Sequence, residues 1–376
     1  MTKTARLLRE LVALPSVNPY LMPHDSPGTG EKQVADYLAE SASRAGLDVS
    51  FQKVEQGRAN LLLRLSPLNR TRQRVLLAPH LDTVPPSAPG QLIPKIHNGR
   101  LYGRGACDTK GSVAAMFTAI LNCAALKKRP AQTEILFSGL VDEESGQRGS
   151  RHFAACNIKA DLAIVGEPTR LRVITAHKGA VWLRLRTRGK AAHGARPDLG
   201  QNAILKMARL VEALETKYAA ALVFRHHPLL GHATINVGVI RGGSQPNIVP
   251  DLCEIEVDRR TLPGETDAAV RNEIRRVATA AEIKIEIDSA HEKICPPLET
   301  NPTLPLVARL MAVAGQKQPL GAPFFCDAAI LAQGGIPSVI FGPGDIAQAH
   351  TADEWIELDQ VERAAGLLTR FLSALP

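Results

Sequence analysis

Residues 74–82 read RVLLAPHLD, a short apolar run that ends in a histidine and an aspartate. The first part of this run, residues 74–78, predicts a β-strand. Similar runs predict strands at 60–65, 133–140 and 161–165, and helices are predicted at 31–44 and 110–126. Strands separated by helices are typical of an α/β fold, in which helices cover both faces of a mostly parallel, mixed sheet.

The middle of the chain has a different pattern. Residues 182–187 alternate between apolar and polar side chains, as a half-exposed strand does. Further strands are predicted at 234–240, 251–258 and 283–287, with helices at 202–219 and 267–281. This β-α-β-β-α-β order predicts a small antiparallel sheet backed by two helices, which is a ferredoxin-like α+β domain.

After this middle region the chain returns to the first domain. Prolines at 296, 297 and 302 mark the return, and a helix at 304–314, a strand at 338–341 and a helix at 359–375 complete the domain. We therefore expect a first domain made of residues 1–177 and 294–376, and an inserted domain at 178–293.

Length and composition limit the classes of protein. The chain has 376 residues, 45% hydrophobic and 22% charged, which suits two domains with a sizeable core. The uncharged stretch 111–126 is too short to cross a bilayer, and residues 1–22 do not have the pattern of a signal peptide. We expect a soluble, cytoplasmic protein without a membrane partner.

The charge of the chain is positive but dispersed. The net charge is +8, aromatic residues make up 4%, and basic residues occur in short groups such as 127–129. Nucleic-acid binding usually needs a basic block with aromatic residues, so an anionic small molecule is the better prediction, and a merely soluble basic surface is better still. The six cysteines are scattered without a Cys-x-x-Cys pair, which predicts reduced thiols rather than a zinc ribbon.

Acidic residues and histidines collect just after the predicted strands: His80, Asp82, Glu143, Glu144, Glu167 and His350. In an open parallel sheet these loops form the ligand crevice, so we expect the side chains to converge. Imidazole and carboxylate without thiolate suit zinc, manganese or cobalt. Asp82 lies on the same face of the chain as His80 and could orient its ring. Of Glu143 and Glu144, one could bind metal while the other acts as a base.

Residues 103–111, GRGACDTKG, allow two interpretations. Two spaced glycines before a helix suggest a dinucleotide loop, but no clear strand precedes them and Asp108 replaces the third glycine. A carboxylate at this place would repel a pyrophosphate. Asp108 could cap the helix or bridge two cations, and we favour the bridge.

Six motifs together resemble the M20 family of dinuclear zinc peptidases and deacylases: LPSVNP at 14–19, PHLDTVP at 79–85, GRGACDTKG at 103–111, DEESG at 142–146, GEPT at 166–169 and AHTADEW at 349–355. The match runs nearly from end to end. The resemblance implies two Zn²⁺, for which Co²⁺ or Mn²⁺ can substitute.

The resemblance also implies roles for individual residues. His80 and Glu167 would bind one zinc, Glu144 and His350 the other, and Asp108 both, while Glu143 would be the general base and Asp82 would orient His80. In the inserted domain, His193 resembles the family histidine that steadies the oxyanion, usually across a dimer. Asn247 and Arg260 resemble contacts to a substrate carboxylate. Arg259 is the alternative to Arg260, unless it is only a surface charge at a strand end.

The resemblance implies a hydrolase that cleaves the amide bond of an N-acyl amino acid or short peptide with metal-activated water. Residues 341–350 most resemble acetylornithine deacetylases, and a homodimer through the inserted domain is expected. A succinyl-diaminopimelate desuccinylase, a dipeptidase or carboxypeptidase, and a metal-free amino-acid-binding relative remain alternatives. Cys107 and Cys326, where the chain departs from the family pattern, are expected to be small buried thiols.

Overall fold

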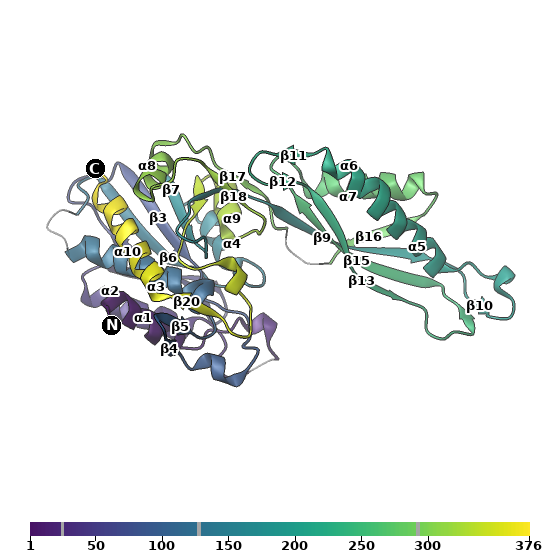
Figure 1. The fold of residues 1–376 in the computed structure, drawn as a ribbon, viewed down its shortest axis with the longest axis horizontal. Coiled ribbons are helices and arrows are strands. Elements are labelled where there is room, and N and C mark those ends of the chain that lie inside the picture. Colours follow the sequence, from purple (N-terminus) through teal and green to yellow (C-terminus); the bar gives the residue numbers. More distant parts are fainter. Residues whose placement is uncertain (24–25, 126–128, 291–293) are drawn as a thin grey trace. The chain divides into compact units, whose positions relative to one another are not determined.

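The computed structural model describes residues 1–23, 26–125, 129–290 and 294–376. These residues form two compact units, many of whose elements are labelled in Figure 1. Unit 1 comprises Met1–Thr175, Thr300–Leu320 and Cys326–Pro376, and unit 2 comprises Ala176–Glu299 and Gly321–Phe325. The insertion expected at 178–293 differs from unit 2 at both ends, and its expected last residue, Lys293, lies outside the described residues.

Unit 1 contains a mixed sheet. Its strands pair in the order β1 (Asp48–Glu55), β2 (Arg58–Leu65), β6 (Thr133–Gly139), β3 (Gln73–Pro79), β7 (Leu162–Gly166), β19 (Ser338–Ile340) and β8 (Ile174–His177). The central strands β6, β3, β7 and β19 are parallel, whereas β1, β2 and β8 pair antiparallel with their neighbours. Strand β8 runs on into unit 2, where its Ala176 and His177 pair with the short strand β17 (Leu298–Glu299). The short strand β18 (Leu320–Ala322) also pairs with β8. The predicted mostly parallel, mixed sheet is confirmed.

Helices lie against both faces of this sheet. One set shares a hydrophobic core with the central strands: α1 (Lys3–Val12), α2 (Lys32–Arg44), α3 (Gly111–Ala125), α8 (Pro305–Val313) and α10 (Leu358–Ser373). Helices α4 (Arg148–Ala155) and α9 (Asp327–Gln333) pack on each other, and α9 packs on β7 and β19. Helix α3 is apolar on nearly all sides and therefore buried. The end predicted for α3, Leu126, lies outside the described residues.

A small second sheet in unit 1 was missed by the sequence prediction. It consists of β4 (Lys95–His97), β5 (Arg100–Tyr102) and β20 (Trp355–Glu357). The expectation of no strand before Gly103 is wrong, because β5 ends at Tyr102. Three residues carry too little periodicity to reveal a strand, and β5 is stabilised by pairing with β20, far away in the sequence.

Unit 2 has the predicted β-α-β-β-α-β order. Strands β9 (Gly179–Arg188), β13 (Thr234–Gly242), β15 (Leu252–Thr261) and β16 (Ile285–Ser289) form an antiparallel sheet in the order β13-β15-β9-β16. Helices α5 (Ala203–Ala213), α6 (Ala219–Val223) and α7 (Asp267–Ala280) form one core with the sheet (Figure 1). Residues 214–218, between α5 and α6, form a π-helical turn. A short hairpin, β11 (His226–His227) and β12 (Gly231–His232), follows α6.

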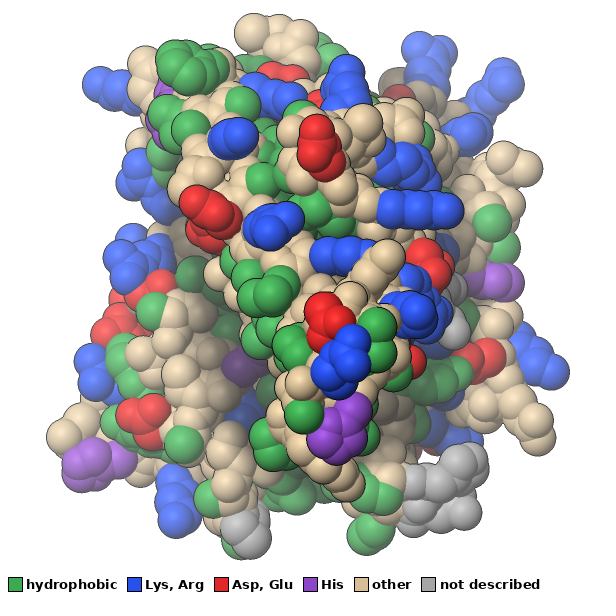
Figure 2. All heavy atoms as spheres, turned by 90° about the vertical axis from the view of Figure 1, so that its right-hand side faces the viewer, with side chains coloured by type: hydrophobic (Ala, Val, Ile, Leu, Met, Phe, Trp, Pro, Cys, Tyr) green, Lys and Arg blue, Asp and Glu red, His purple; other side chains and the backbone are tan. Residues whose placement is uncertain are grey.

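Charged side chains of the unit 2 sheet pair across neighbouring strands. Arg184 and Arg186 of β9 contact Glu256 and Glu254 of β15 at 2.8 and 2.7 Å. On the face of the molecule in Figure 2, basic and acidic side chains are interspersed. Within the described ranges, the structure contains no helix that combines the length and apolar character needed to cross a membrane.

Candidate metal centre

His80 and Asp82 lie directly after strand β3, and Asp82 organises this part of the centre. His80 Nδ1 lies 3.4 Å from Asp82 Oδ1 and 3.0 Å from the Asp82 carbonyl oxygen. The Asp82 carboxylate also accepts the backbone N–H groups of Glu143 and Glu144, at 3.1 and 3.0 Å. Asp82 therefore fixes both the ring of His80 and the loop that follows β6.

Asp108 lies between two histidines from distant segments. Its Oδ1 is 3.1 Å from His80 Nε2, and its Oδ2 is 3.4 Å from His350 Nε2. His350 Nε2 is also 3.1 Å from Glu144 Oε2. Asp108 does not act as an ordinary helix cap, because α3 begins only at Gly111 and the Asp108 backbone is not helical. One carboxylate thus faces a different imidazole with each oxygen.

Glu167, at the end of β7, completes the group. Its side chain is buried, and Oε1 lies 4.0 Å from His80 Nε2. Among the described residues, none donates a hydrogen bond to this oxygen. A buried carboxylate oxygen without a donor is costly unless a cation neutralises it.

The pKa shifts of the carboxylates also indicate that the centre needs a cation. Burial, with the nearby carboxylate of Asp108, raises the pKa of Glu144 to about 7. Burial also raises the pKa of Glu143 and Glu167 well above the ordinary range, with repulsion between the two carboxylates adding to the shift of Glu143. The pKa of Asp108 is lowered, because hydrogen bonds with His350 and His80 outweigh the effect of burial. The cluster has an excess of carboxylates over cations.

The donor set fits divalent metal ions. A ligand atom from each of His80, Asp108 and Glu144 lies within 4.8 Å of the other two. Imidazole nitrogens and carboxylate oxygens without thiolate suit zinc, cobalt and manganese. Glu144 belongs to this group and lies 3.1 Å from His350, so it is the candidate ligand of the adjacent pair and Glu143 is the candidate base. The expected convergence of the loop residues around β3, β6 and β7 is present.

The expected thiols are both buried. Cys107 Sγ lies 3.3 Å from the carbonyl oxygen of Asp345, and Cys326 precedes helix α9. Burial raises the pKa of each thiol well above its ordinary value, which disfavours the thiolate that a metal needs.

Next to Cys326, the buried Asp327 accepts a hydrogen bond from Ser150 Oγ at 2.6 Å, and burial raises the pKa of Asp327 to about 7.

A buried polar network behind the centre was not predicted. Asn18 Nδ2 donates to Asp82 Oδ2 at 2.7 Å and to Asp142 Oδ1 at 3.0 Å. Asp142 in turn accepts from Arg58 at 3.1 Å, and its backbone N–H donates to Glu31. Asn18 lies in a motif that suggested the family, but nothing in the sequence around it indicates carboxylate partners 64 and 124 positions away.

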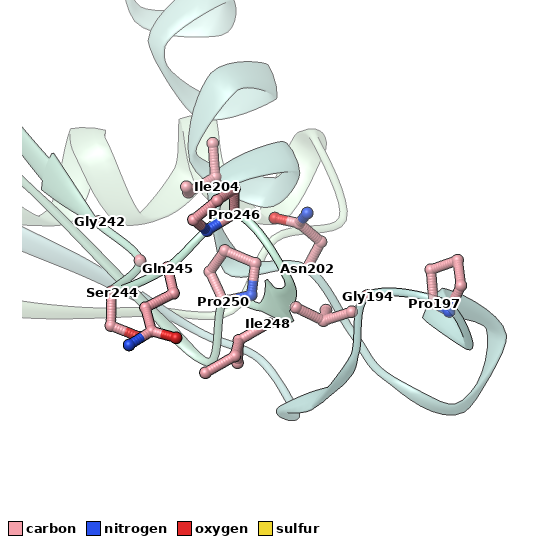
Figure 3. A pocket seen from close by; sticks show the side chains of 12 residues that line it. Gly194, Pro197, Asn202, Ile204, Gly242, Ser244, Gln245, Pro246, Ile248 and Pro250 are labelled. Carbon is pink, nitrogen blue, oxygen red and sulfur yellow. The ribbon is translucent and has the colours of Figure 1, made fainter.

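His193 and Asn247 lie together in unit 2. Strand β10 (Ala192–His193) pairs with β14 (Ile248–Val249), and the Gly194 N–H donates to the Asn247 carbonyl at 2.7 Å. His193 Nδ1 accepts the Ala195 N–H at 3.1 Å, so in the neutral ring the proton is on Nε2. Gly194 borders a groove of about 550 Å³, which Figure 3 shows beside the loop from Gly242 to Pro250.

The structure distinguishes Arg259 from Arg260. Arg259 is completely buried, with Nη2 2.6 Å from Glu265 and Nε 3.2 Å from Tyr218 Oη. The interpretation of Arg259 as a strand-end surface charge is therefore wrong, because alternate residues of β15 point into the core. Arg260 is partly exposed, and it contacts Asp258 at 2.9 Å and the ring of Phe325 at 5.6 Å. Arg260 is the member of the pair that a ligand can reach.

Comparison with known proteins agrees with this chemistry. The model of peptidase family M20/M25/M40 matches residues 76–374. An acetylornithine deacetylase of Aliivibrio fischeri (strain MJ11) is 32% identical over 355 residues, which cover 91% of this chain and 91% of that protein.

Solved structures show the same fold. The aminopeptidase PepT from Bacillus cereus superimposes with a TM-score of 0.79 at 23% identity, covering 99% of this chain and 97% of that one. A dinuclear metal-binding peptidase of family M20 from Bacillus subtilis has a TM-score of 0.72 at 14% identity, with 99% and 97% covered.

Proposed function

The chain belongs to peptidase family M20/M25/M40 and is a metal-dependent amidohydrolase, and we propose that it removes the acetyl group from an N-acetylated amino acid of the ornithine type. The observation that carries the metal-dependent chemistry of this proposal is the position of Asp108, whose two oxygens face His80 and His350. The likeness to an acetylornithine deacetylase over 91% of both chains supports the substrate class.

The proposed cofactor is a pair of Zn²⁺ ions, for which Co²⁺ or Mn²⁺ can substitute. His80 and Glu167 would hold one ion, Glu144 and His350 the other, and Asp108 both. What such ions supply when bound is Lewis acidity toward the acyl oxygen and toward water. Oε1 of Glu167, which accepts no hydrogen bond from the described residues, and the carboxylate excess of the centre support this assignment.

The protein groups would carry out the proton transfers and the orientation of the substrate. Glu143 is proposed to take the proton of the attacking water and to pass it to the leaving amine. Asp82 would hold His80 in one tautomer. In unit 2, Asn247 and Arg260 would contact the substrate carboxylate, and His193 would donate from Nε2 to the developing oxyanion. The contact between Ala195 N–H and His193 Nδ1 supports the last role, because it leaves Nε2 as the donor.

We further propose a homodimer through unit 2, in which His193 serves the partner's centre. Two features of unit 2 support a self-association surface. The outer edge of β13 has no strand partner among the described residues. Several large apolar side chains of unit 2 are also exposed: Leu199, Leu205, Ile240, Ile248 and Leu252.

A small-molecule substrate and a cytoplasmic location complete the proposal. Arg184 and Arg186 contact acidic neighbours, and a surface neutralised in this way suits a small-molecule enzyme better than a nucleic-acid binder. Cys107, Cys123, Cys156, Cys253 and Cys326 are free thiols, which suits a reducing compartment.

The test is a substrate panel assayed on purified protein with zinc and with a chelator. The proposal predicts the highest kcat/KM for N-acetylornithine, loss of activity with the chelator and recovery with zinc. A higher kcat/KM for N-succinyl-diaminopimelate or a dipeptide would replace the proposed substrate class. If the zinc-loaded protein binds these substrates without hydrolysing them, the proposed enzymatic activity is contradicted. That result would favour an amino-acid-binding relative.

A further inference from the structure

Glu354 receives four hydrogen bonds from a single loop. Its Oε1 accepts the backbone N–H groups of Cys107 and Asp108, at 2.9 and 3.0 Å. Its Oε2 accepts the N–H of Gly105 at 3.0 Å and Arg104 Nη1 at 2.6 Å. Glu354 and Arg104 are buried, with side-chain exposures of 0% and 2%.

The loop that binds Glu354 cannot satisfy these N–H groups by itself. Gly105 has φ near 80°, in the left-handed region, and Asp108 has φ −117° and ψ 91°. Residues 106–110 form one π-helical turn before α3, and the N–H groups of Cys107 and Asp108 lie in its first turn, where a helix has no carbonyl partners of its own. Successive N–H groups that point to one place form a concave anion-binding nest. Here a carboxylate of the same chain occupies it.

Glu354 also belongs to the segment that carries His350. Strand β20 pairs with β5 so that Trp355 lies opposite Tyr102, and the Gly103 N–H donates to the Glu354 carbonyl at 3.1 Å. Arg104 Nη2 reaches the Thr351 carbonyl at 3.3 Å. The Glu354–Arg104 pair therefore ties the loop of Asp108 to the segment of His350.

We propose that Glu354, held by Arg104, is a positioning residue that sets the affinity of the centre for its metal ions. Asp108 and His350 come from segments far apart in the sequence, and their separation of 3.4 Å depends on how the two segments are joined. Glu354 joins them at the backbone of Asp108 itself. This inference rests on the proposed function, because it assigns Asp108 and His350 to the metal ions.

A purely stabilising role for this buried ion pair makes a different prediction. Glu134, in β6, is also a buried carboxylate paired with an arginine, Arg74. It lies near the start of β6, whereas the loop of Glu143 follows the end of that strand. Glu134→Gln is therefore a control that weakens the ion pair of a buried carboxylate away from the centre, where the arginine partner is partly exposed.

The experiment measures Zn²⁺ affinity by competition with a chelator, together with thermal unfolding of the metal-free proteins. Glu354→Gln places an amide N–H₂ against backbone N–H donors, so we expect zinc affinity to fall about 10–100-fold, the range typical for partners that orient metal ligands. Glu134→Gln is expected to lower the unfolding temperature of the metal-free protein while retaining wild-type zinc affinity.

Three results would overturn the inference. Wild-type zinc affinity in Glu354→Gln would do so, and so would an equal loss of affinity in Glu134→Gln. If Glu354→Gln does not fold, Arg104→Lys takes its place, because it keeps the backbone donors and weakens the hold on Glu354. A fall in zinc affinity in Arg104→Lys supports the inference, and wild-type affinity overturns it. Absence of zinc binding by the wild-type protein would instead contradict the proposed function itself.

Discussion

The two units differ in how completely their charged side chains are paired. In unit 1, Asp108, Glu144 and Glu167 gather around histidines, and one buried oxygen of Glu167 accepts no hydrogen bond from the described residues. In unit 2, Arg186 and its neighbours on the sheet contact acidic partners on adjacent strands. The first arrangement is unbalanced and buried, whereas the second is balanced and largely at the surface.

The difference indicates that the carboxylate centre of unit 1, and not the sheet of unit 2, is where a functional arrangement lowers stability. Carboxylates crowded in a buried place repel each other and raise each other's pKa, which costs free energy in the absence of a cation. Exposed ion pairs cost and contribute little. We therefore expect changes at the unit 1 centre to alter chemistry and metal binding, and changes in the unit 2 sheet to alter stability slightly.

The largest effect is expected for Glu143→Gln. Glu144, which contacts His350, is the proposed ligand of the adjacent pair and Glu143 is the proposed base, so loss of Glu143 should spare metal binding. Removal of a general base lowers kcat about 10²–10⁴-fold. Steady-state kinetics with metal analysis measure this result.

Glu144→Gln is the matched control for that prediction. Glu144 lies 3.1 Å from His350, so its substitution should weaken metal binding. Full activity in Glu143→Gln, or metal loss there with retention in Glu144→Gln, would reverse the roles of the two residues.

The next effect concerns His193, an exposed residue of unit 2. His193→Ala should lower kcat about 10²–10³-fold, as expected when a donor to an oxyanion is lost, while metal content and oligomeric state stay unchanged. Mixing inactive His193→Ala with inactive Glu143→Gln should restore part of the activity if the histidine acts across subunits. After confirmed subunit exchange, no recovery would exclude action in trans.

A smaller effect is expected from the buried His177. Burial lowers its pKa to about 4 from the ordinary 6.5, so the unfolded chain binds the proton more readily. The free energy of unfolding should therefore fall as the pH drops from 6.5 to 4, by at most about 1.4 kcal/mol per pH unit. Denaturant titrations across this range should show a shallower pH dependence for His177→Gln than for the wild type. Equal slopes in wild type and His177→Gln would refute the assignment.

The smallest effect is expected for Arg186→Gln on the unit 2 sheet. Its contact with Glu254 is a partly exposed cross-strand pair, and ion pairs that water reaches contribute little to stability. The unfolding temperature should change by no more than about 2 °C, and less at high salt. A loss of metal or a large drop in unfolding temperature would break the contrast between the units.

Much of the fold could be predicted from the sequence, because the apolar runs and alternations that mark its strands are local patterns. The strand before His80 and the strand before Glu143 are short apolar runs, and parallel strands bring their ends to one edge. The alternation in β9 likewise predicted the antiparallel sheet of unit 2. These features depend on residues close together in the sequence.

The remaining features depend on contacts between distant segments. Asn18 joins Asp82 to Asp142, and Glu354 fills the nest before α3, yet neither has a local signal beyond a family motif. Arg259 looks like a surface charge because a strand end gives no information about which face is buried. Hydrogen-bond partners tens to hundreds of positions apart cannot be derived from spacing.

Zinc stoichiometry of wild-type and Asp108→Ala protein tests the central claim most directly, namely that the unbalanced carboxylate cluster of unit 1 is a metal centre organised around Asp108. Elemental analysis should find two zinc ions per wild-type chain. Because Asp108 faces both His80 and His350, Asp108→Ala should lose metal from both sites, with the fold confirmed by circular dichroism. Two zinc ions retained by the folded variant would contradict the account.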